Sequence, residues 1–389
     1  MINRRIHSFF DKRRCTLLGI GPMSKNCVDA TIETANEYEI PLMLIASRRQ
    51  IDAEFLGGGY VNNWSTETFS KYVIENDKKG FIILARDHGG PWQNDKEKNN
   101  QLSFRLAMES AKKSFEIDII SGFEIIHLDP SLDVFKTPSV EDVLERIYEL
   151  YEFCWSVAKR NNKQIAFEIG TEEQTGSINS TEEIEFVLNK MFDFCDKNHF
   201  IRPIFLVTQT GTSVKETRNV GTFDSPLRIA HELPSEILVP KIVELCNKNK
   251  IFMKVHNTDY LSDESLRWYP KIGIHAANVA PEFGVTETRA FLSLLKKYQL
   301  TEEYDHFIDL AFQSGQWKKW MLPDTNATHI DKAVIAGHYT FGSDKYQTIK
   351  ASAQKKLSEL NININNLLKE EIKKSLFKYI KHFGLMRLS

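Results

Sequence analysis

The stretch Phe81-Ile-Ile-Leu-Ala-Arg-Asp87-His88-Gly-Gly-Pro-Trp92 decides the expected fold. Its five mostly apolar residues follow the turn-like Asp77-Lys-Lys-Gly80 and predict a strand that is buried on both faces. The strand ends abruptly at an acid, a histidine and two glycines. In α/β folds the carboxyl ends of parallel strands carry the functional site. Asp87 and His88 are therefore candidate site residues, although in isolation they would fit a helix cap and a turn residue equally well.

The same pattern recurs along the chain, with a short apolar run, polar residues directly after it, and then an amphipathic helical stretch. We expect eight strands, at about 16–22, 41–46, 81–86, 123–130, 164–171, 203–207, 251–255 and 271–274. Eight strands that alternate with eight helices are typical of a (β/α)8 barrel, also called a TIM barrel. A doubly wound open sheet is the alternative, but the sequence has no dinucleotide-binding fingerprint to favour it.

The predicted strands stop near residue 300, and the rest of the chain is expected to be helical. The sequence therefore divides into a barrel at 1–300 and a helical C-terminal extension at 301–389. Within 364–383, apolar residues recur every three or four positions, opposite lysines and glutamates, which predicts an amphipathic helix. Its apolar stripe must be buried somewhere. We predict a homo-oligomer in which this segment contributes to the contact, with packing against the barrel's own helices as the alternative.

Composition narrows the class of protein. The 389 residues are 42% hydrophobic and 26% charged, which is typical of a globular protein with a large core. A net charge of -2 argues against a nucleic-acid surface. No apolar run is long enough to span a membrane, and the first residues lack the apolar segment of a signal peptide. The five cysteines are scattered without CxxC spacing, which favours reduced thiols. We expect a cytoplasmic protein without nucleic-acid or membrane partners.

Polar residues follow almost every predicted strand, and in a barrel they would share one mouth. They are Asp87, His88, Asp129, Glu168, Glu172, Gln209, His256, Asp259, His275 and Asn278. Histidine nitrogens and carboxylate oxygens around an open position suit a catalytic divalent metal. Such a metal polarises a sugar carbonyl and stabilises an enediolate, and carboxylates in excess of the ligands can move protons. The alternative is that several of these residues cap strand ends or form hydrogen bonds to the metal ligands without binding the metal themselves.

Five motifs resemble the accessory-subunit family of class II tagatose-bisphosphate aldolase. They are Asp87-His88-Gly-Gly-Pro-Trp, His127-Leu-Asp129, Glu168-Ile-Gly-Thr-Glu, Gln209-Thr-Gly and His256-Asn-Thr-Asp-Tyr, in the family's order, within a resemblance that covers about 16–295. The resemblance implies a (β/α)8 barrel similar to the catalytic class II ketose-bisphosphate aldolases. Members of the accessory family are described as non-catalytic subunits that sustain the activity and stability of an aldolase partner.

The likeness to the catalytic class II aldolases implies roles for individual residues. Two of their zinc-binding histidines would fall on His88 and His256, a glutamate on Glu168, and the acid that handles the substrate proton on Asp87. Their strand-six histidine has no counterpart, because Thr208-Gln209-Thr210 occupies that position. Gln209 would offer an amide oxygen in place of the imidazole, which is a departure from the zinc aldolases.

We therefore predict a metal-dependent enzyme, with Zn2+ as the expected ion, that acts on a phosphorylated or acidic sugar by aldol cleavage or epimerisation. The expected metal ligands are His88, Glu168, His256 and Gln209, and the expected catalytic carboxylates are Asp87, Glu172 and Asp259. The expected substrate-binding residues are Arg48, Gln50, Asp129, Lys271, His275 and Asn278. The main alternative is a non-catalytic barrel subunit that stabilises and activates a class II aldolase partner. A sugar-binding protein of unrelated role is a further alternative.

Overall fold

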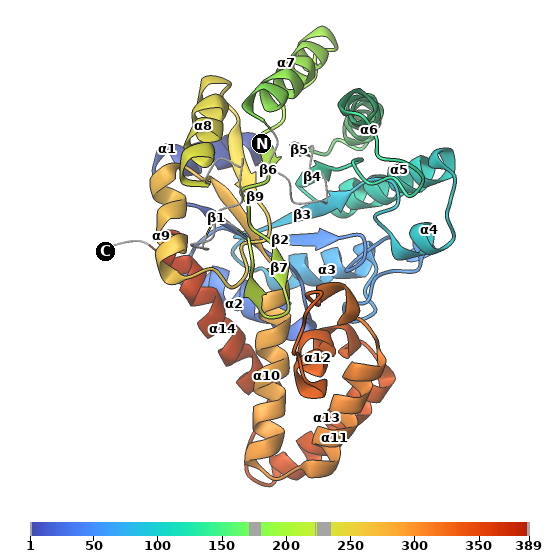
Figure 1. The fold of residues 1–389 in the computed structure, drawn as a ribbon, viewed down its shortest axis with the longest axis vertical. Helices are drawn as coiled ribbons and strands as arrows, with labels where there is room; N and C mark the ends of the chain where they lie inside the picture. The colour runs from blue at the N-terminus through green and yellow to red at the C-terminus, as the bar shows by residue number, and fades with distance from the viewer. Residues whose placement is uncertain (1, 171–179, 222, 224–234, 387–389) are drawn as a thin grey trace.

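The computed structural model describes residues 2–170, 180–221, 223 and 235–386. Within it, eight parallel strands close into a barrel in the order β1, β10, β9, β6, β5, β4, β3 and β2 (Figure 1). The strands are β1 (Leu17–Ile20), β2 (Leu42–Ser47), β3 (Ile82–Gly89), β4 (Ile125–Leu128), β5 (Ala166–Gly170), β6 (Phe205–Thr208), β9 (Phe252–Val255) and β10 (Ala276–Val279). This architecture confirms the predicted (β/α)8 fold.

Helices follow the strands around the outside of the barrel (Figure 1). They are α2 (Lys25–Tyr38), α3 (Thr66–Asn76), α5 (Phe104–Ser121), α6 (Val140–Arg160), α7 (Thr181–Lys197), α8 (Ser235–Lys248) and α9 (Asp263–Ile272), with a short α4 (Asp95–Asn99) before α5. Serine side chains fix where several of them begin, because they accept otherwise unpaired backbone N–H groups. Ser24 accepts the N–H of Cys27 at the start of α2, and Ser65 and Ser139 form capping boxes at α3 and α6.

The amino-terminal half of the barrel interior is filled by apolar side chains. They belong to Leu17, Met43, Ile45, Ile83, Ala85, Ile125, Ala166, Phe205 and Ala276. Helix α1 (Ile2–Asp11), which the sequence analysis did not predict, packs Ile2 and Ile6 into this cluster at the amino ends of the strands. The apolar plug therefore leaves only the carboxyl end of the barrel for a polar site.

The eighth strand lies further along the chain than predicted. The run Lys271-Ile-Gly-Ile is not a strand, because α9 ends at Ile272 and Gly273 caps the helix with a φ of 92°, a left-handed conformation that glycine adopts easily. The strand of the barrel is Ala276–Val279 instead. Its alanines have little strand propensity of their own, and it is completely buried between β1 and β9.

The C-terminal extension is helical, as predicted, and it forms a second core with α10 (Pro281–Lys297). Its elements are α11 (Thr301–Gln313), η2 (Lys318–Trp320), α12 (His329–Ala336), η3 (Gly337–Thr340), α13 (Asp344–Ser358) and α14 (Ile364–His382). Figure 1 shows α10 leading away from the barrel and α14 returning to it.

Helix α14 buries its apolar stripe within the chain. Ile364 and Leu368 belong to the core of the extension, and Ile372, Leu376, Tyr379 and Ile380 belong to the main core of the barrel. The helix packs against α2, α9 and α10. The alternative of intramolecular packing is therefore what the structure shows for this stripe, and a homo-oligomer stays a prediction that needs another surface.

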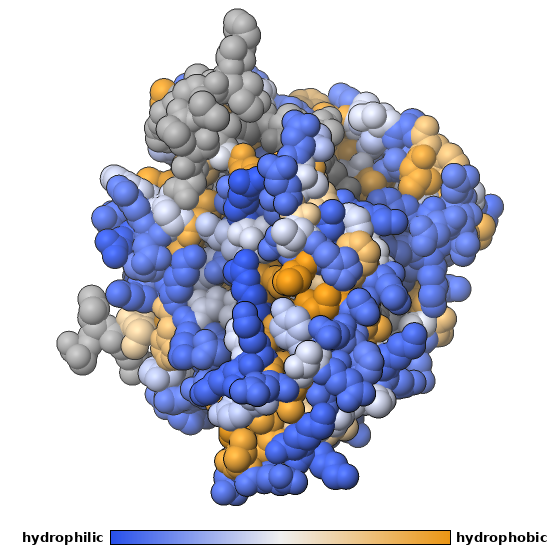
Figure 2. All heavy atoms as spheres, turned by 60° about the horizontal axis from the view of Figure 1, so that its bottom comes forward, coloured by the Kyte–Doolittle hydropathy of each residue, from blue (hydrophilic) through white to orange (hydrophobic). Residues whose placement is uncertain are grey.

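Two further observations concern the surface and the thiols. Hydrophilic residues cover most of the face in Figure 2, and apolar residues appear in patches near its centre and lower edge. In the described part of the chain, no helix has the combination of length and apolarity that crossing a bilayer requires. The cysteines are free and buried, as expected from their scattered spacing.

Candidate functional site

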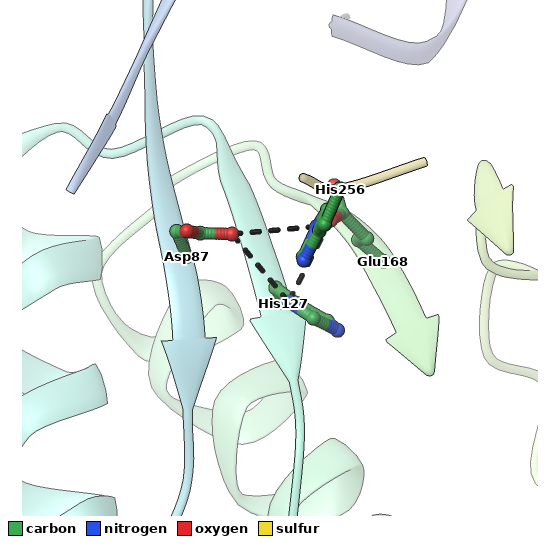
Figure 3. Close-up of side chains that lie close together, drawn as sticks. All are labelled: Asp87, His127, Glu168 and His256. Atoms are coloured by element: carbon green, nitrogen blue, oxygen red, sulfur yellow. Dashed lines mark ion pairs between the residues drawn. The ribbon is translucent and has the colours of Figure 1, made fainter. Parts of the chain in front are cut away.

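Four side chains converge where the apolar plug ends. On β3, β4 and β5 the next inward position after Ala85, Ile125 and Ala166 is Asp87, His127 and Glu168, because side chains on a strand alternate between its faces. His256, directly after β9, completes the group, in which one ligand atom from each residue lies within 4.8 Å of the others (Figure 3). The register of the barrel strands thus assembles residues from four distant segments.

The distances within this cluster are those of interacting but not tightly bonded groups. His256 Nε2 lies 3.5 Å from Asp87 Oδ1 and 3.7 Å from Glu168 Oε1. His127 Nδ1 lies 3.9 Å from Asp87 Oδ1 and 3.6 Å from Glu168 Oε1. Figure 3 shows Asp87 on one side and Glu168 on the other, with both imidazoles between them. Two carboxylates and two imidazoles are a donor set that suits a divalent transition metal.

Glu168 has one oxygen engaged and one that remains available. Its Oε2 accepts a hydrogen bond of 2.7 Å from Nζ of Lys254, and the two groups form an ion pair. The side chain of Lys254 points inward from β9, and both side chains are fully buried. Its Oε1 has no hydrogen-bond partner among the described residues, and neither has the buried Nε2 of His127. A buried polar atom without a hydrogen-bond partner destabilises the folded state. A cation bound next to Oε1 of Glu168 would supply the missing partner. The residues present therefore fit a divalent metal.

Electrostatics keep both carboxylates of the cluster ionised. Burial alone would raise the pKa of Asp87, but His88, His256, His127 and Lys254 outweigh it and hold the pKa well below its usual range. For Glu168, burial also opposes ionisation, and Lys254 and the histidines lower the pKa to about 2. Ionised carboxylates are the form that binds a cation.

His88 lies beside the cluster and connects it to Asp129. Its Nε2 is 3.1 Å from Nδ1 of His256, and its Nδ1 is 2.8 Å from Asp129 Oδ2. Gln93 Nε2 donates to the same carboxylate oxygen at 3.1 Å. The backbone of His88 has a φ of 45°, an uncommon conformation for a residue other than glycine, and the pairing of β3 with β4 shifts register here. Because of this bulge, the ring of His88 departs from the regular inward and outward alternation of side chains along β3.

Asn278 holds Asp87 from the opposite side of the barrel. Its Nδ2 donates to Asp87 Oδ1 at 3.0 Å. Space for this side chain comes from Gly19 on β1, where a Cβ would lie 2.3 Å from Asn278 Oδ1. The prediction of strand eight was wrong in position, but Asn278 still reaches the site because it lies on the true strand β10.

Asp259 has the reverse electrostatic environment from Asp87. Burial and the nearby Glu282 raise its pKa to about 7, against the opposing effect of backbone N–H groups. Its Oδ1 accepts the N–H of Ala280 at 3.0 Å and that of Glu282 at 2.8 Å, where α10 begins. A carboxyl group with a pKa near neutrality can both accept and return a proton.

Several of these side chains line a pocket of about 510 Å3, whereas His127 and Glu168 are buried behind it. Asp87, His88, His256, Asp259 and Asn278 line it together with the polar side chains of Gln50, Gln93, Gln209 and Asn257. Arg49, Lys215, Lys319, Trp320 and Tyr339 line it as well, so the C-terminal extension contributes to the wall. The sequence analysis treated that extension as separate from the site.

Several predicted site residues lie elsewhere. Arg48 is buried against Asp52 and Glu97, at 3.1 and 2.6 Å, and does not line the pocket, whereas its neighbour Arg49 does. Lys271 lies in the last turn of α9, and its carbonyl accepts a hydrogen bond from Arg14. Glu172 lies outside the described residues.

His275 lies before β10, at the amino end of the barrel. Its Nδ1 accepts the N–H of Met253 at 3.2 Å, and its ring packs on Phe10 and Phe252. Burial lowers its pKa to about 4, so the ring is neutral near pH 7. Substrate binding by Lys271 and His275 was inferred from a misplaced strand, and both residues are at the end of the barrel opposite the pocket.

Sequence reasoning missed His127 and Lys254 as site residues. Both lie inside strands, whereas the residues predicted from the sequence lie mostly after strands. The signal that would have found them is the two-residue alternation, since His127 precedes Asp129 by two positions and Lys254 precedes His256 by two. His127 belongs with Asp87, Glu168 and His256 to the group that could hold a metal ion, and ligation by His88 stays a prediction.

Comparisons with known proteins identify the fold. No family model matches this sequence, and no curated protein matches it. Among solved structures, a probable tagatose 6 phosphate kinase from Sinorhizobium meliloti 1021 is similar over 94% of this chain and 100% of its own, with a TM-score of 0.72 and 16% identity. The fructuronate-tagaturonate epimerase UxaE from Cohnella laeviribosi is similar over 95% of this chain and 81% of its own, with a TM-score of 0.59 and 11% identity.

The YdjI aldolase from Escherichia coli K12 is also similar, over 99% of this chain and 97% of its own, with a TM-score of 0.53 and 12% identity. At such low identities the likeness shows the fold alone. Membership of the accessory-subunit family of tagatose-bisphosphate aldolase stays a prediction. The chain is a TIM-barrel protein whose structural neighbours carry the names of sugar-metabolism proteins.

Proposed function

We propose that this protein is a divalent-metal-dependent enzyme that acts on a sugar by aldol cleavage or epimerisation, with Zn2+ as the best-suited ion. The observation that carries the proposal is the cluster of Asp87, His127, Glu168 and His256 around the open oxygen of Glu168, beside the pocket. Imidazole and carboxylate ligands favour zinc over magnesium or calcium. The names of two structural neighbours, an aldolase and a sugar-acid epimerase, support a sugar as the substrate.

The bound metal would polarise the carbonyl of the sugar and stabilise the negative charge that develops on its oxygen. The amide side chains of Gln50, Gln209 and Asn278 line the pocket and offer hydrogen bonds to sugar hydroxyls. Asn278 also keeps the Asp87 carboxylate in place. These residues orient the substrate, because amides can both donate and accept.

Asp259 would carry the proton transfers, because it lines the pocket and burial raises its pKa to about 7, whereas Asp87 stays ionised. In aldol cleavage, the base takes the hydroxyl proton of the β-carbon while the carbon–carbon bond breaks, and the enediolate that leaves then accepts a proton. In epimerisation, the base takes the C–H proton next to the carbonyl, and a proton returns to the opposite face. Either reaction needs a group that accepts a proton and returns it, which Asp259 can do with a pKa near 7.

The second candidate function is a non-catalytic subunit that stabilises a class II aldolase partner. One observation favours it: Lys254 already neutralises Glu168 inside the barrel, at 2.7 Å, so this carboxylate can be stable without any metal. A class II aldolase would then be the partner. The two candidates differ in whether the cluster binds metal.

Elemental analysis of the purified full chain tests the proposal. We expect about one divalent ion per chain, which is lost in His127→Ala and His256→Ala, because each substitution removes an imidazole ligand. His306→Ala is the matched control, since His306 is an exposed residue of α11 far along the chain from the cluster. A wild-type protein that neither retains metal nor gains thermal stability from added Zn2+ would contradict the enzyme and favour the subunit.

A further inference from the structure

The pocket has opposite charges on its lining. Asp87 and Asp259 are acidic, whereas Arg49, Lys215 and Lys319 supply three cationic side chains. The cations come from three separate parts of the chain. Arg49 follows β2, Lys215 belongs to the hairpin of β7 (Val214–Lys215) and β8 (Arg218–Asn219), and Lys319 belongs to η2 of the extension. Folding brings them to one cavity, although nothing in their sequence spacing predicts this.

The extension is held against the barrel on both sides of η2. On one side, the N–H of Glu216 donates to the carbonyl of Trp320 at 2.8 Å, and Lys215 Nζ donates to the carbonyl of Lys319 at 3.2 Å. These contacts fix η2 to the β7–β8 hairpin, so the backbone position of Lys319 is determined by the barrel.

On the other side, the loop after β2 contacts the segment around η3. Asn63 Nδ2 donates to the carbonyl of Gly342 at 2.7 Å, and the rings of Tyr60 and Tyr339 pack with centroids 4.8 Å apart. Trp320 Nε1 donates to Tyr339 Oη at 3.2 Å, which joins the two sides. The extension therefore forms a fixed part of the wall of the pocket.

Lys319 carries a charge that its surroundings leave uncompensated. No carboxylate of the described residues lies within ion-pair distance of its Nζ, which instead lies 4.8 Å from the ring centroid of Tyr339 and 5.4 Å from that of Trp320. Arg49 is only partly compensated, through a 2.8 Å pair with the exposed Asp95. Cationic groups concentrated in a concave site attract and bind anions.

We propose that Arg49, Lys215 and Lys319 form a subsite for the anionic terminal group of the substrate, a phosphate or a carboxylate, and that the extension thereby selects acidic sugars. The subsite rests on the proposed function, because it assigns one end of the same pocket to the charged end of the sugar. The other end of the sugar, which carries the carbonyl, then lies toward Asp87 and His256. Because the lining of the pocket carries both acidic and cationic side chains, a sugar with one anionic end would bind in a single direction.

Binding measurements on the full chain test the subsite with three probes, which are inorganic phosphate, glucuronate and neutral glucose. We expect the wild type to bind phosphate or glucuronate more tightly than glucose, and the tighter anion identifies the terminal group. Lys319→Gln and Arg49→Gln should each weaken anion binding about tenfold, since each removes a charge-assisted hydrogen bond. Lys318→Gln is the matched control, because Lys318 is exposed on the same turn and does not line the pocket.

Unchanged anion affinity in Lys319→Gln, or no preference of the wild type for either anion over glucose, would overturn the subsite. Metal content of the same samples separates this result from a failure of the proposed function. A protein that binds metal but shows no Lys319-dependent anion binding keeps the metal site and loses the subsite. A protein that binds anions through Lys319 but no metal keeps the subsite and loses the metal-dependent reaction.

Discussion

Lys254 and Glu168 form an ion pair inside the barrel, with Nζ 2.7 Å from Oε2 and both side chains fully buried. Glu168 uses its two oxygens differently: one is paired with Lys254, and the other faces the two histidines of the cluster. Lys254 places a fixed positive charge beside the proposed metal position. The affinity of the site for a cation is therefore set partly by Lys254, which offsets one of the two carboxylates.

Removal of Lys254 should destabilise the metal-free protein. In Lys254→Met, Glu168 would be buried without its cation, and we expect the free energy of unfolding to fall by about 3–5 kcal/mol, as for other buried pairs that lose one partner. Urea denaturation with chelator present measures this. The double variant Lys254→Met/Glu168→Gln should recover part of the loss. A single variant as stable as the wild type would mean that the pair contributes nothing.

Replacement of Asp259 should separate proton transfer from metal binding. Asp259→Asn keeps an oxygen that can accept the N–H groups of Ala280 and Glu282, but it removes the group that titrates near pH 7. We expect turnover to fall about 100- to 10,000-fold on whichever ketose phosphate or uronate the wild type converts, with unchanged metal content. Normal turnover would assign the proton transfers to another group.

The fold could be predicted because most strands appear as short apolar runs between clear helix signals. The eighth strand could not, since Ala276-Ala-Asn-Val279 is weakly apolar and the preceding Ile272 and Ile274 imitate a strand. Helix α1 was missed because its role, to close the amino end of the barrel, depends on a tertiary contact. Sequence periodicity does not report such contacts.

The site could be predicted in location but only partly in composition. Asp87, Glu168 and His256 were identified because they stand at the carboxyl ends of strands, and the structure brings these three together with His127. To identify His127 and Lys254, one must know which side chains of each strand point into the barrel, and this depends on the register of the strands. Arg49 and Lys319 come together only because the extension packs against the barrel. No local sequence pattern could have predicted that they line the same pocket.

His338 should make the protein sensitive to acid. It is buried, neither ring nitrogen has a partner among the described residues, and burial lowers its pKa to about 3. Well above pH 6.5 the ring is neutral in both the folded and the unfolded chain. As the pH falls from 6.5 towards 3, only the unfolded chain takes up the proton, so stability is lost at about 1.4 kcal/mol per pH unit.

His338→Phe removes this titration and should reduce the loss of unfolding free energy between pH 6.5 and 4.5 by about 2–3 kcal/mol. Denaturation at the two pH values measures the difference. His306→Ala serves as the control, because its exposed side chain should leave the pH dependence unchanged. If His338→Phe had the same pH dependence as the wild type, the buried neutral ring would not be the cause.

Helix α14 offers a direct test of the intramolecular stripe. Leu376 is fully buried in the core of the barrel, whereas Leu367 on the same helix is 43% exposed. Leu376→Ala should lower the free energy of unfolding by about 2–5 kcal/mol, because it leaves a cavity, and Leu367→Ala should change it by less than about 1 kcal/mol. Equal effects of the two substitutions would contradict the packing of this helix on the barrel.

Anion binding through Lys319 should depend on pH in a defined direction. Burial and the nearby Arg49 lower the pKa of Lys319 to about 8. Lys98 also lowers this pKa, Asp95 raises it, and Lys215 donates a hydrogen bond to the carbonyl of Lys319. Lys319 is therefore charged below pH 8 and loses its charge as the pH rises through 8. We expect the affinity for phosphate or glucuronate to fall between pH 7 and 9 for this reason.

Lys319→Arg separates the charge of this residue from other pH effects. A guanidinium group stays protonated throughout this range, so the variant should retain at pH 9 most of the affinity that it has at pH 7. Lys319→Gln should show weak binding at both values. Calorimetric titrations at the two pH values, with glucose as the neutral reference, give the comparison. Parallel losses of affinity in the wild type and in Lys319→Arg would show that Lys319 does not carry the pH dependence.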